Sequence, residues 1–546
     1  MGRGISLIKR RKHNNSYGAN SNPFAFGAGD EGSIPSARAS VHGVVVAHRK
    51  THRDTHMKNI NDFEKVPSTK KATSTNKLIN NLYVNTSLGR TENNALTYTR
   101  SGSALLDFFA QAGAMRPRPD KALDLFKKAY AEDHVKAVKL LFYLRDIRGG
   151  QGERTLFRNC LQWLGETHPT VFEGIVRYVA EYGRWDDMFF DNDTCFQAIS
   201  AQLEKDMFSS GEVSLLAKWL PTINASSPTT RAKARFIAQN IGMREIEYRK
   251  NIRDLRHRIN IVEKQMSNRE WGGINYSSVP SQAARIYRNA FRRHDEARYG
   301  AFIDSVQKGE ETMKAATLYP YQIYKSAMSD YSKALDALWK SLPDYTQGNN
   351  ALVIADVSGS MYGDPLSVSV SLALYFAERN TGQFKDHFIT FSESPKLQRV
   401  QGSTLIDRMN SIERSEWSMS TDLQAVFELL LDTAVRNGVP PEDMPTTLYI
   451  ISDMEFNEAA EGETNFEAVE RKYTLAGYAR PSIVFWNVNA RGDNTPVLEN
   501  QDGVTMVSGF SPTVFKMVVE GKTPERLMLD VINSERYASI EVPANI

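Results

Sequence analysis

Leu352-Val353-Ile354-Ala355 is a run of apolar residues, and the polar segment Asp356-Val357-Ser358-Gly359-Ser360 follows it directly. A short apolar run of this kind is typical of a strand that is buried on both faces of a sheet. Comparable runs lie at 387–391, 447–452 and 482–488, and helical patterns at 367–379 and 421–437 separate them. Because buried strands alternate with helices, residues 346–546 are predicted to form a doubly wound α/β domain around a parallel sheet.

Five oxygen-bearing side chains are predicted to gather at the carboxyl edge of this sheet. Asp356 follows the first strand, and Ser358 and Ser360 lie in the same loop, where Gly359 allows the chain to bend. Thr421 opens a helix after the segment 418–420, and Asp453 follows the strand 447–452. Ligands bind at this edge of an open parallel sheet. Carboxylate and hydroxyl oxygens suit hard cations, so we expect a divalent ion, Mg²⁺ before Mn²⁺ or Ca²⁺.

This constellation resembles the metal-ion-dependent adhesion site of von Willebrand A domains, and all five ligand types of that family are present. The resemblance implies a Rossmann-like von Willebrand A-type domain. Since the protein supplies few charged ligands, the ion keeps a position that a carboxylate or a phosphate of a partner can fill. We interpret Asp422 as a helix cap or a support of the site, and Glu455 as a surface acid. The alternative is a loop that only caps a helix.

Composition narrows the class of protein. The chain has 546 residues and 41% apolar content, which is ordinary for a globular protein of two or more domains. Two cysteines are too few for a disulfide framework, and no long uncharged apolar segment occurs, so we expect a cytoplasmic protein outside the membrane. We also expect a monomer. The net charge is −13 over residues 350–546 and +16 over residues 1–349, which points the N-terminal part toward polyanions.

Residues 81–345 are predicted to form an all-α domain of HEAT-like helical repeats, although no strict repeat period is visible. Apolar residues at spacings of three and four over 246–266 predict one long amphipathic helix there. The segment 146–154, Asp-Ile-Arg-Gly-Gly-Gln-Gly-Glu-Arg, is predicted to be a turn between helices. It does not end in Gly-Lys-Ser/Thr and follows a helix, so it is not interpreted as a nucleotide-binding loop.

Two basic clusters in the helical part are candidates for binding RNA. The stretch 231–298 carries 16 Lys and Arg against 7 Asp and Glu. The candidate residues are Arg249, Lys250, Arg253 and Arg256 in one cluster, and Arg285, Arg288, Arg292 and Arg293 in the other, with Tyr287 and Phe291 interleaved. Arginine suits bidentate phosphate contacts, and aromatic rings can stack on unpaired bases. A solvated basic face, or pairing with the acidic C-terminal part, would explain the same pattern.

The segments Thr91-Glu92-Asn93-Asn94-Ala95-Leu96-Thr97-Tyr98 and Ser101-Gly102-Ser103-Ala104-Leu105-Leu106-Asp107-Phe108-Phe109 are similar to the opening of the TROVE domain of Ro ribonucleoproteins. The turn at 146–154 and the segment Tyr182-Gly183-Arg184-Trp185-Asp186-Asp187 look more like an uncharacterised TROVE-like branch. The resemblance implies a helical RNA-binding domain before a von Willebrand A domain. It also implies binding of small or misfolded RNA, as structured RNA or as single-stranded ends, without catalysis.

Residues 1–80 are rich in polar and basic residues without periodicity, which predicts a disordered basic tail, with Met57 as an alternative start. The sequence therefore predicts a non-catalytic ribonucleoprotein with a metal-dependent docking domain. One alternative is a metal-dependent protein-binding scaffold without RNA. Another is a metal-dependent phosphoesterase, since a hard cation with an open position can activate water.

Overall fold

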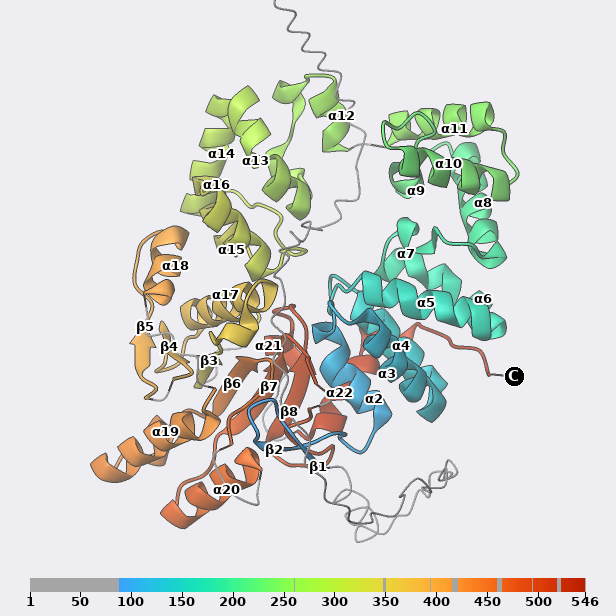
Figure 1. Ribbon diagram of the computed structural model, residues 1–546. Coiled ribbons are helices and arrows are strands. Elements are labelled where there is room, and N and C mark those ends of the chain that lie inside the picture. The colour runs from blue at the N-terminus through green and yellow to red at the C-terminus, as the bar shows by residue number, and fades with distance from the viewer. Residues whose placement is uncertain are drawn as a thin grey trace, which may run out of the picture. The chain divides into compact units, whose positions relative to one another are not determined.

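The computed structural model describes residues 88–545, apart from 260, 347–349, 393, 415–420, 459–463, 493 and 518–521 (Figure 1). The predicted basic tail, with its alternative start at Met57, lies outside the described residues. So do part of the predicted polar link, at 347–349, and the segment 418–420. Residues 84–546 form one compact unit.

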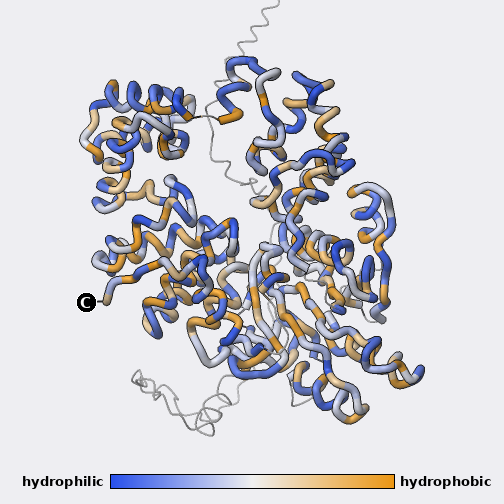
Figure 2. Tube along the Cα trace, turned by 180° about the vertical axis from the view of Figure 1, so that it is seen from behind, coloured by the Kyte–Doolittle hydropathy of each residue, from blue (hydrophilic) through white to orange (hydrophobic). Residues whose placement is uncertain are grey.

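The first half of this unit is helical, as predicted, but it opens with a two-stranded antiparallel hairpin of β1 (Leu88–Arg90) and β2 (Leu96–Tyr98). Strands of three residues are too short to show an alternating pattern. The α-helices are α2 (Ala104–Gln111), α3 (Pro119–Glu132), α4 (His134–Arg145), α5 (Thr155–Thr167), α6 (Pro169–Ile175), α7 (Val179–Tyr182), α8 (Asp193–Phe208), α9 (Leu216–Trp219), α10 (Pro228–Asn240), α11 (Glu245–Arg258), α12 (Val262–Ser267), α13 (Ser281–His294), α14 (Glu296–Lys308), α15 (Pro320–Ser329) and α16 (Lys333–Lys340). Figure 2 shows polar and apolar residues alternating along them, as amphipathic helices require.

The prediction of one long helix over 246–266 is wrong. Helix α11 ends at Arg258, Ile259 is extended with φ −77 and ψ 125, and α12 begins at Val262. Arg258 donates hydrogen bonds to the carbonyl oxygens of Asp206 and Gly211, at 2.9 and 3.0 Å, which ties the end of α11 to another part of the chain. The apolar stripe is buried as expected. Packing therefore breaks the helix although the apolar spacing continues, because two short helices can bury the apolar stripe as well as one long helix can.

The turn at 146–154 lies between α4 and α5, as predicted. Gly150 is required there, because a Cβ atom on this residue would lie 1.9 Å from the carbonyl oxygen of Tyr143. Residues 119–145 form two helices, since Asp133 ends α3 and caps α4 by accepting a hydrogen bond from the Lys136 amide.

The second half contains a six-stranded sheet in the order β5-β4-β3-β6-β7-β8, and only the β4–β5 pair is antiparallel. Its elements are β3 (Ala351–Ala355), α17 (Asp364–Arg379), β4 (His387–Thr390), β5 (Leu397–Arg399), α18 (Leu405–Glu413), α19 (Leu423–Asn437), β6 (Thr447–Ser452), α20 (Asn465–Ala476), β7 (Ser482–Asn487), β8 (Val504–Ser508), α21 (Val514–Met517), α22 (Pro524–Ile532) and α23 (Glu535–Ala538). The predicted helix-plus-α/β organisation is confirmed, and β5 and β8 add strands that the sequence pattern did not predict.

The order of strands places the candidate site. The chain moves outward from β3 to β4 and β5, then returns to the other side of β3 and continues through β6, β7 and β8. The strand order therefore reverses beside β3, at its border with β6. Ligand crevices form at such a point, outside the carboxyl ends of the strands.

The helical part packs directly against the sheet. Helix α2 lies on β8, where the Ser508 hydroxyl donates to the carbonyl oxygen of Phe109 at 3.1 Å and accepts from the Gly113 amide at 3.1 Å. The β1–β2 hairpin reaches the loops after β6 and β7 through isolated bridges from Asn94 to Asn457 and from Tyr98 to Thr495. The start of the described chain thus lies beside the carboxyl edge of the sheet.

Among the described residues, none of the helices is both long and apolar enough to cross a lipid bilayer. Both cysteines, Cys160 and Cys195, are buried free thiols.

Candidate functional site

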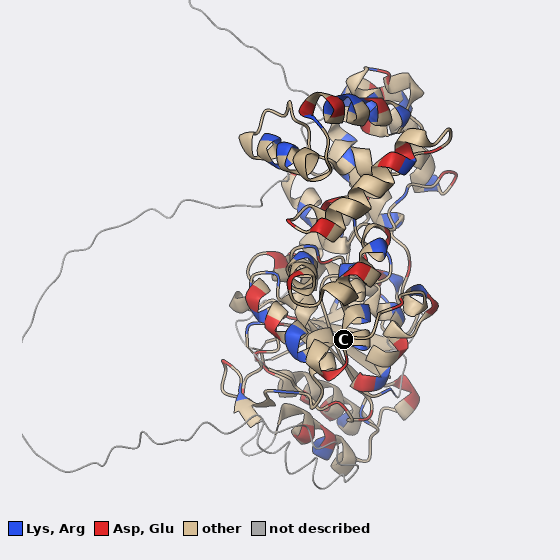
Figure 3. Cartoon of the chain, turned by 90° about the vertical axis from the view of Figure 1, so that its right-hand side faces the viewer, with Lys and Arg blue, Asp and Glu red and all other residues tan. Residues whose placement is uncertain are grey.

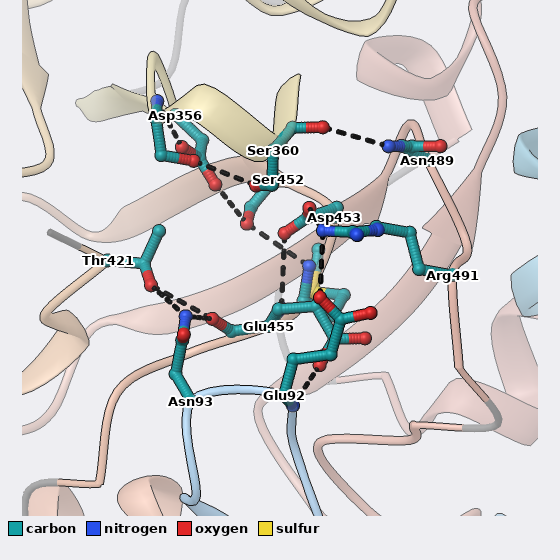
Figure 4. Close-up of polar contacts among 12 residues, drawn as sticks. Glu92, Asn93, Asp356, Ser360, Thr421, Ser452, Asp453, Glu455, Asn489 and Arg491 are labelled. Atoms are coloured by element: carbon teal, nitrogen blue, oxygen red, sulfur yellow. Dashed lines mark hydrogen bonds and ion pairs between the residues drawn. The ribbon is translucent and has the colours of Figure 1, made fainter. Parts of the chain in front are cut away.

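Two carboxylates from neighbouring parallel strands meet at the carboxyl edge of the sheet. Asp356 follows β3 and Asp453 follows β6, and both side chains are buried. The Asp356 amide donates to the carbonyl oxygen of Ile451 at 2.9 Å, which continues the β3–β6 ladder into the loop. Figure 4 shows the side chains of both aspartates turned toward the same space, with Ser360 and Ser452 between them.

The loop after β3 holds Asp356 in a fixed position. Its Oδ1 accepts a hydrogen bond from the Ser358 amide at 2.9 Å, and its Oδ2 accepts one from the Ser452 hydroxyl at 2.6 Å. The hydroxyls of Ser358 and Ser360 lie 3.0 Å apart. The structure therefore brings together four of the five predicted metal ligands: Asp356, Ser358, Ser360 and Asp453.

Asp453 is only partly satisfied by the protein. Its Oδ1 accepts from the Glu455 amide at 3.2 Å, whereas its Oδ2 is buried without a hydrogen-bond partner in the described part of the chain. The nearest cation is the Arg491 guanidinium, 4.0 Å from Oδ2. Burial and the charge of Asp453 raise the pKa of Asp356 to about 6, and burial also raises the pKa of Asp453. Two buried carboxylates therefore repel each other unless a cation lies between them.

The residues present fit a hard divalent cation. A buried carboxylate pair with one oxygen free, flanked by two serine hydroxyls, offers the oxygen ligands that Mg²⁺, Mn²⁺ and Ca²⁺ prefer. Over the described ranges there is no group of three or more His, Cys, Asp or Glu that could hold a metal ion. A cation here would thus depend on hydroxyls and water to complete its coordination.

Thr421 is the predicted ligand that lies apart from the others. Its hydroxyl is 2.9 Å from the carbonyl oxygen of Glu455 and 3.0 Å from Asn457 Oδ1, and it accepts a hydrogen bond from Asn93 at 3.1 Å. In Figure 4 the side chain points toward Asn93 and Glu455. Its role as a ligand remains a prediction. To bind an ion, the Thr421 hydroxyl would have to give up these hydrogen bonds. Asp422 is the N-cap of α19, as expected, and accepts from the Ala425 amide at 3.0 Å.

The residues that surround Asp453 were not predicted from the sequence. Glu455, expected to be a surface acid, is buried, and burial raises its pKa. Its carboxylate accepts from the Glu92 amide at 2.6 Å and from Asn494 at 2.7 Å. Glu92 in turn lies 2.8 Å from the Arg491 guanidinium. The one local signal was that Glu455 follows Asp453 by two residues at a strand end.

The first basic cluster, on α11, divides into exposed and packed residues. Arg249 and Lys250 are exposed, and Arg253 is exposed but pairs with Asp254 at 2.9 Å. Arg256 donates hydrogen bonds to the carbonyl oxygens of Ala217 and Leu220, at 2.8 and 2.6 Å, and to the Thr222 hydroxyl at 2.8 Å. A phosphate would have to displace these contacts in order to bind Arg256.

The second cluster, on α13, divides in the same way. Arg285 donates to the Ser326 hydroxyl at 3.0 Å, and Arg288 is buried and donates to the carbonyl oxygen of Asp330 at 3.0 Å. Arg292 and Arg293 are exposed and line an open polar hollow of about 420 Å³ together with Asn289 and Glu296.

The interleaved aromatic residues do not form a stacking surface. Phe291 is buried in the core against Tyr276 and Tyr299, and Tyr287 is partly buried. Figure 3 shows acidic residues interspersed among the basic ones along the helices. The RNA-binding role of the eight candidate residues remains a prediction, and the exposed members Arg249, Lys250, Arg292 and Arg293 are the ones placed to contact a ligand.

Comparison with known proteins gives matches along most of the chain. Residues 350–539 match the family described as domain of unknown function DUF7788, and residues 91–181 and 225–352 match domain of unknown function DUF2828. A protein of Acanthamoeba polyphaga mimivirus, named uncharacterized protein L728, is 29% identical over 501 residues, which cover 82% of this chain and 87% of the relative.

Among solved structures, the RO (RSR) protein of Deinococcus radiodurans is similar over 78% of this chain and 93% of its own, at 12% sequence identity and a TM-score of 0.30. A TM-score this low supports no conclusion about fold or function. The chain is thus similar to a mimivirus protein and to two domain families, all three without an assigned function.

Proposed function

We propose that this protein is a non-catalytic, Ro-like RNA-binding protein whose C-terminal part is a von Willebrand A-type domain that docks a partner through a divalent cation. The buried pair Asp356 and Asp453, with one carboxylate oxygen free, carries the docking part of this proposal. Removing two carboxylates from water is costly, and a structure keeps such a pair where a cation compensates it. The sequence resemblances to the TROVE domain of Ro ribonucleoproteins and to von Willebrand A domains support the same interpretation.

Each residue of the site would have a defined part in holding the cation. Asp356 and Asp453 would supply the charged ligands, and Ser358 and Ser360 neutral oxygens. Mg²⁺ is the first choice, with Mn²⁺ or Ca²⁺ as alternatives. The bound ion would supply electrostatic attraction for an oxygen of a partner's acidic side chain. Ser452 would orient Asp356 through its 2.6 Å hydrogen bond.

RNA binding is proposed for the helical part, through the exposed cations Arg249, Lys250, Arg292 and Arg293. These side chains can contact phosphates without breaking the packing that holds Arg256 and Arg288. The aromatic residues of α13 are packed inward and cannot stack on bases. The exposed cations would therefore contact the phosphates of the RNA backbone and not the bases. A cytoplasmic location and a monomeric state remain predictions.

The RNA part is tested with the purified full chain and a fluorescein-labelled single-stranded RNA. We expect fluorescence anisotropy to show binding at low salt, an affinity that falls steeply as salt rises, and no loss on adding EDTA. Cross-linking in cells followed by sequencing of the attached RNA would identify the ligand. Absence of RNA binding at low salt would contradict this part of the proposal.

The docking part stands separately, because the carboxylate pair favours a cation whether or not RNA binds. It is tested by the loss of a partner upon EDTA treatment and in Asp356→Ala, while RNA binding persists. A partner that stays bound in both cases would contradict metal-dependent docking. If Mg²⁺ or Mn²⁺ instead produced turnover of RNA that Asp356→Ala abolishes, the protein would be a phosphoesterase.

A further inference from the structure

Two sequence segments that the proposed function leaves unused meet in the helical part. One is the glycine-rich turn, which ends at Arg154 immediately before α5, and the other is the segment 182–187, in which the short helix η4 (Trp185–Met188) begins. Arg158, in the first turn of α5, donates to Asp187 and to Asp186, both at 2.7 Å. The start of α5 and the start of η4 are therefore joined by ion pairs.

The ion pairs leave an excess of positive charge. Asp186 is shared by Arg158 and Arg184, at 2.7 and 2.6 Å. Asp187 is shared by Arg158 and Arg145, both at 2.7 Å. Three guanidinium groups are thus neutralised by only two carboxylates.

Two further cations adjoin this network. Arg154 and Lys233 both reach solvent, although neighbouring residues cover part of each side chain, and neither makes an ion pair within the described ranges of the chain. Glu153 precedes Arg154, but it is buried and pairs with Arg116 at 2.6 Å. The cluster therefore holds five cations against two carboxylates: Arg145, Arg154, Arg158, Arg184 and Lys233 against Asp186 and Asp187.

The two unpaired cations lie within electrostatic reach of the paired ones. Partial burial and the guanidinium groups of Arg184 and Arg158 lower the pKa of Arg154. Partial burial and Arg158 lower the pKa of Lys233. Asp186 acts in the opposite direction on both groups, and Asp187 on Arg154, but the repulsion from the arginines is larger. An anion bound among the cations would remove that repulsion.

Aromatic rings and carboxylates hold the cluster in place before any ligand binds. The Arg184 guanidinium lies over the Trp219 ring at 4.0 Å, and Asp186 accepts two hydrogen bonds from it, at 2.8 and 2.6 Å. The Lys233 ammonium lies 5.7 Å from the centre of the Phe189 ring. A guanidinium fixed by stacking and a bidentate pair loses little entropy when it binds an anion.

Helix α5 adds favourable electrostatics. It has 13 residues, no side-chain hydrogen bond caps its N-terminus, and its first turn contains no acidic residue. The N-terminal end of a helix attracts anions through its dipole and its free amides. Arg154 and Arg158 flank this end, so the helix and the cluster act on the same space.

We propose that Arg154, Arg158, Arg184 and Lys233 form a binding site for a phosphate group, in which Arg154 and Lys233 make the contacts that no carboxylate of the described residues occupies. Phosphate suits the cluster because its oxygens accept charge-assisted hydrogen bonds from several cations at once. The group belongs either to the backbone of RNA, in which case this inference rests on the proposed function, or to a small free phosphate.

The test uses the full chain in a phosphate-free buffer with two probes, inorganic phosphate and a labelled single-stranded RNA. Binding of phosphate is measured by broadening of its ³¹P resonance, and binding of RNA by anisotropy. Arg154→Gln/Lys233→Gln removes the two unpaired charges without breaking an ion pair. Lys128→Gln/Lys308→Gln removes two exposed charges on α3 and α14 and serves as the control, and Arg154→Lys/Lys233→Arg keeps the charge.

We expect wild type, the control and the charge-retaining variant to broaden the phosphate signal, and Arg154→Gln/Lys233→Gln to lose the broadening. If the source is RNA, this variant also shows a salt dependence shallower by about 0.7 per removed cation. Unchanged RNA affinity together with lost phosphate binding assigns the site to a free phosphate. If neither probe separates the variant from the control, the site is refuted, even where wild type binds RNA. If phosphate binding is lost and wild type binds no RNA, the site stands and the RNA function fails.

Discussion

The acidic site at the sheet edge and the basic clusters on the helices differ in what holds their functional side chains. Asp356 and Asp453 follow adjacent parallel strands, so the ladder between β3 and β6 determines that they meet. The arginines of α11 and α13 lie on helix faces, where packing decides which side chains remain exposed. Arg256 and Arg288 are used inside the protein, whereas Arg249 and Arg292 reach solvent. Strand topology therefore predicts a site more reliably than the density of charge along a helix.

The largest expected effect is the loss of cation binding in Asp356→Asn. The substitution keeps the shape of the side chain and removes one of two charged ligands. We expect the affinity for Mg²⁺ or Mn²⁺ to fall more than about 100-fold, beyond the effect of losing a single supporting partner of a ligand. Isothermal titration calorimetry measures the affinity, and Asp502→Asn, which alters an exposed carboxylate, is the control.

Thermal unfolding provides a second readout for the same variant. Mg²⁺ at about 100 times its dissociation constant should stabilise wild type by about 2.7 kcal/mol, because it binds only the folded state. The Asp356→Asn protein, with an affinity lower by more than about 100-fold, should gain less than about 0.4 kcal/mol. Equal stabilisation of both proteins by Mg²⁺ would show that the ion binds elsewhere. Strand topology would then have predicted the site no better than the charge pattern of the helices did.

The next effect separates structural arginines from candidate ligand contacts. Arg256→Gln removes three hydrogen bonds to Ala217, Leu220 and Thr222, two of them to carbonyl oxygens. We expect it to lower the free energy of unfolding by about 2 kcal/mol, since bonds to a charged group are worth about 1.5–3 kcal/mol each and part of the loss is recovered by water. The exposed control Arg253→Gln should change stability by less than about 0.5 kcal/mol. Urea unfolding compares the two variants. Equal stabilities would mean that the hydrogen bonds of Arg256 do not stabilise the fold.

The residues of the site show how far the sequence could predict it. Asp356 and Asp453 were predictable because an apolar run followed by an acid marks a strand end, and parallel strand ends share one edge. Ser358 and Ser360 followed from the same loop. Glu92 and Asn93 were not predictable, because they reach Glu455 and Thr421 across more than 300 residues of chain, and no local pattern encodes such a contact.

The fold shows the same division between local and tertiary information. The buried strands β3, β6 and β7 carry continuous apolar runs and were predicted nearly to the residue. Strand β8 mixes polar Thr505 and Ser508 with apolar residues, and its place beside β7 depends on tertiary pairing. The break in the helix at Ile259 also depends on tertiary packing, because the apolar spacing continues through this residue while the helix does not.

A smaller effect tests the exposed cations. Arg292→Gln/Arg293→Gln should weaken RNA binding by about tenfold near 0.1 M salt and make its salt dependence shallower by about 0.7 per removed cation. The two side chains line the open polar hollow on α13, so their loss should leave stability unchanged. Anisotropy over a salt series measures both quantities, with Lys128→Gln/Lys308→Gln as the matched control. Identical slopes for variant and control would remove α13 from the RNA surface.

The smallest expected effect concerns the hairpin that lies against the candidate cation site. Asn93 donates hydrogen bonds to the carbonyl oxygen of Glu455 at 2.6 Å and to the Thr421 hydroxyl at 3.1 Å, so it holds both groups toward the hairpin (Figure 4). Asn93→Ala should cost about 1 kcal/mol of stability, the typical net value of a lost hydrogen bond. If Thr421 is a ligand, its hydroxyl loses Asn93 as a donor and keeps only the contacts to Glu455 and Asn457, so it can turn toward the ion more easily. The affinity for Mg²⁺ should then rise or stay constant despite that loss. A fall in affinity matching that of Thr421→Ala would instead show that the hairpin supports the site in its present geometry. Calorimetry on the two variants therefore decides whether the N-terminal strands of the described chain restrain the cation site or help to build it.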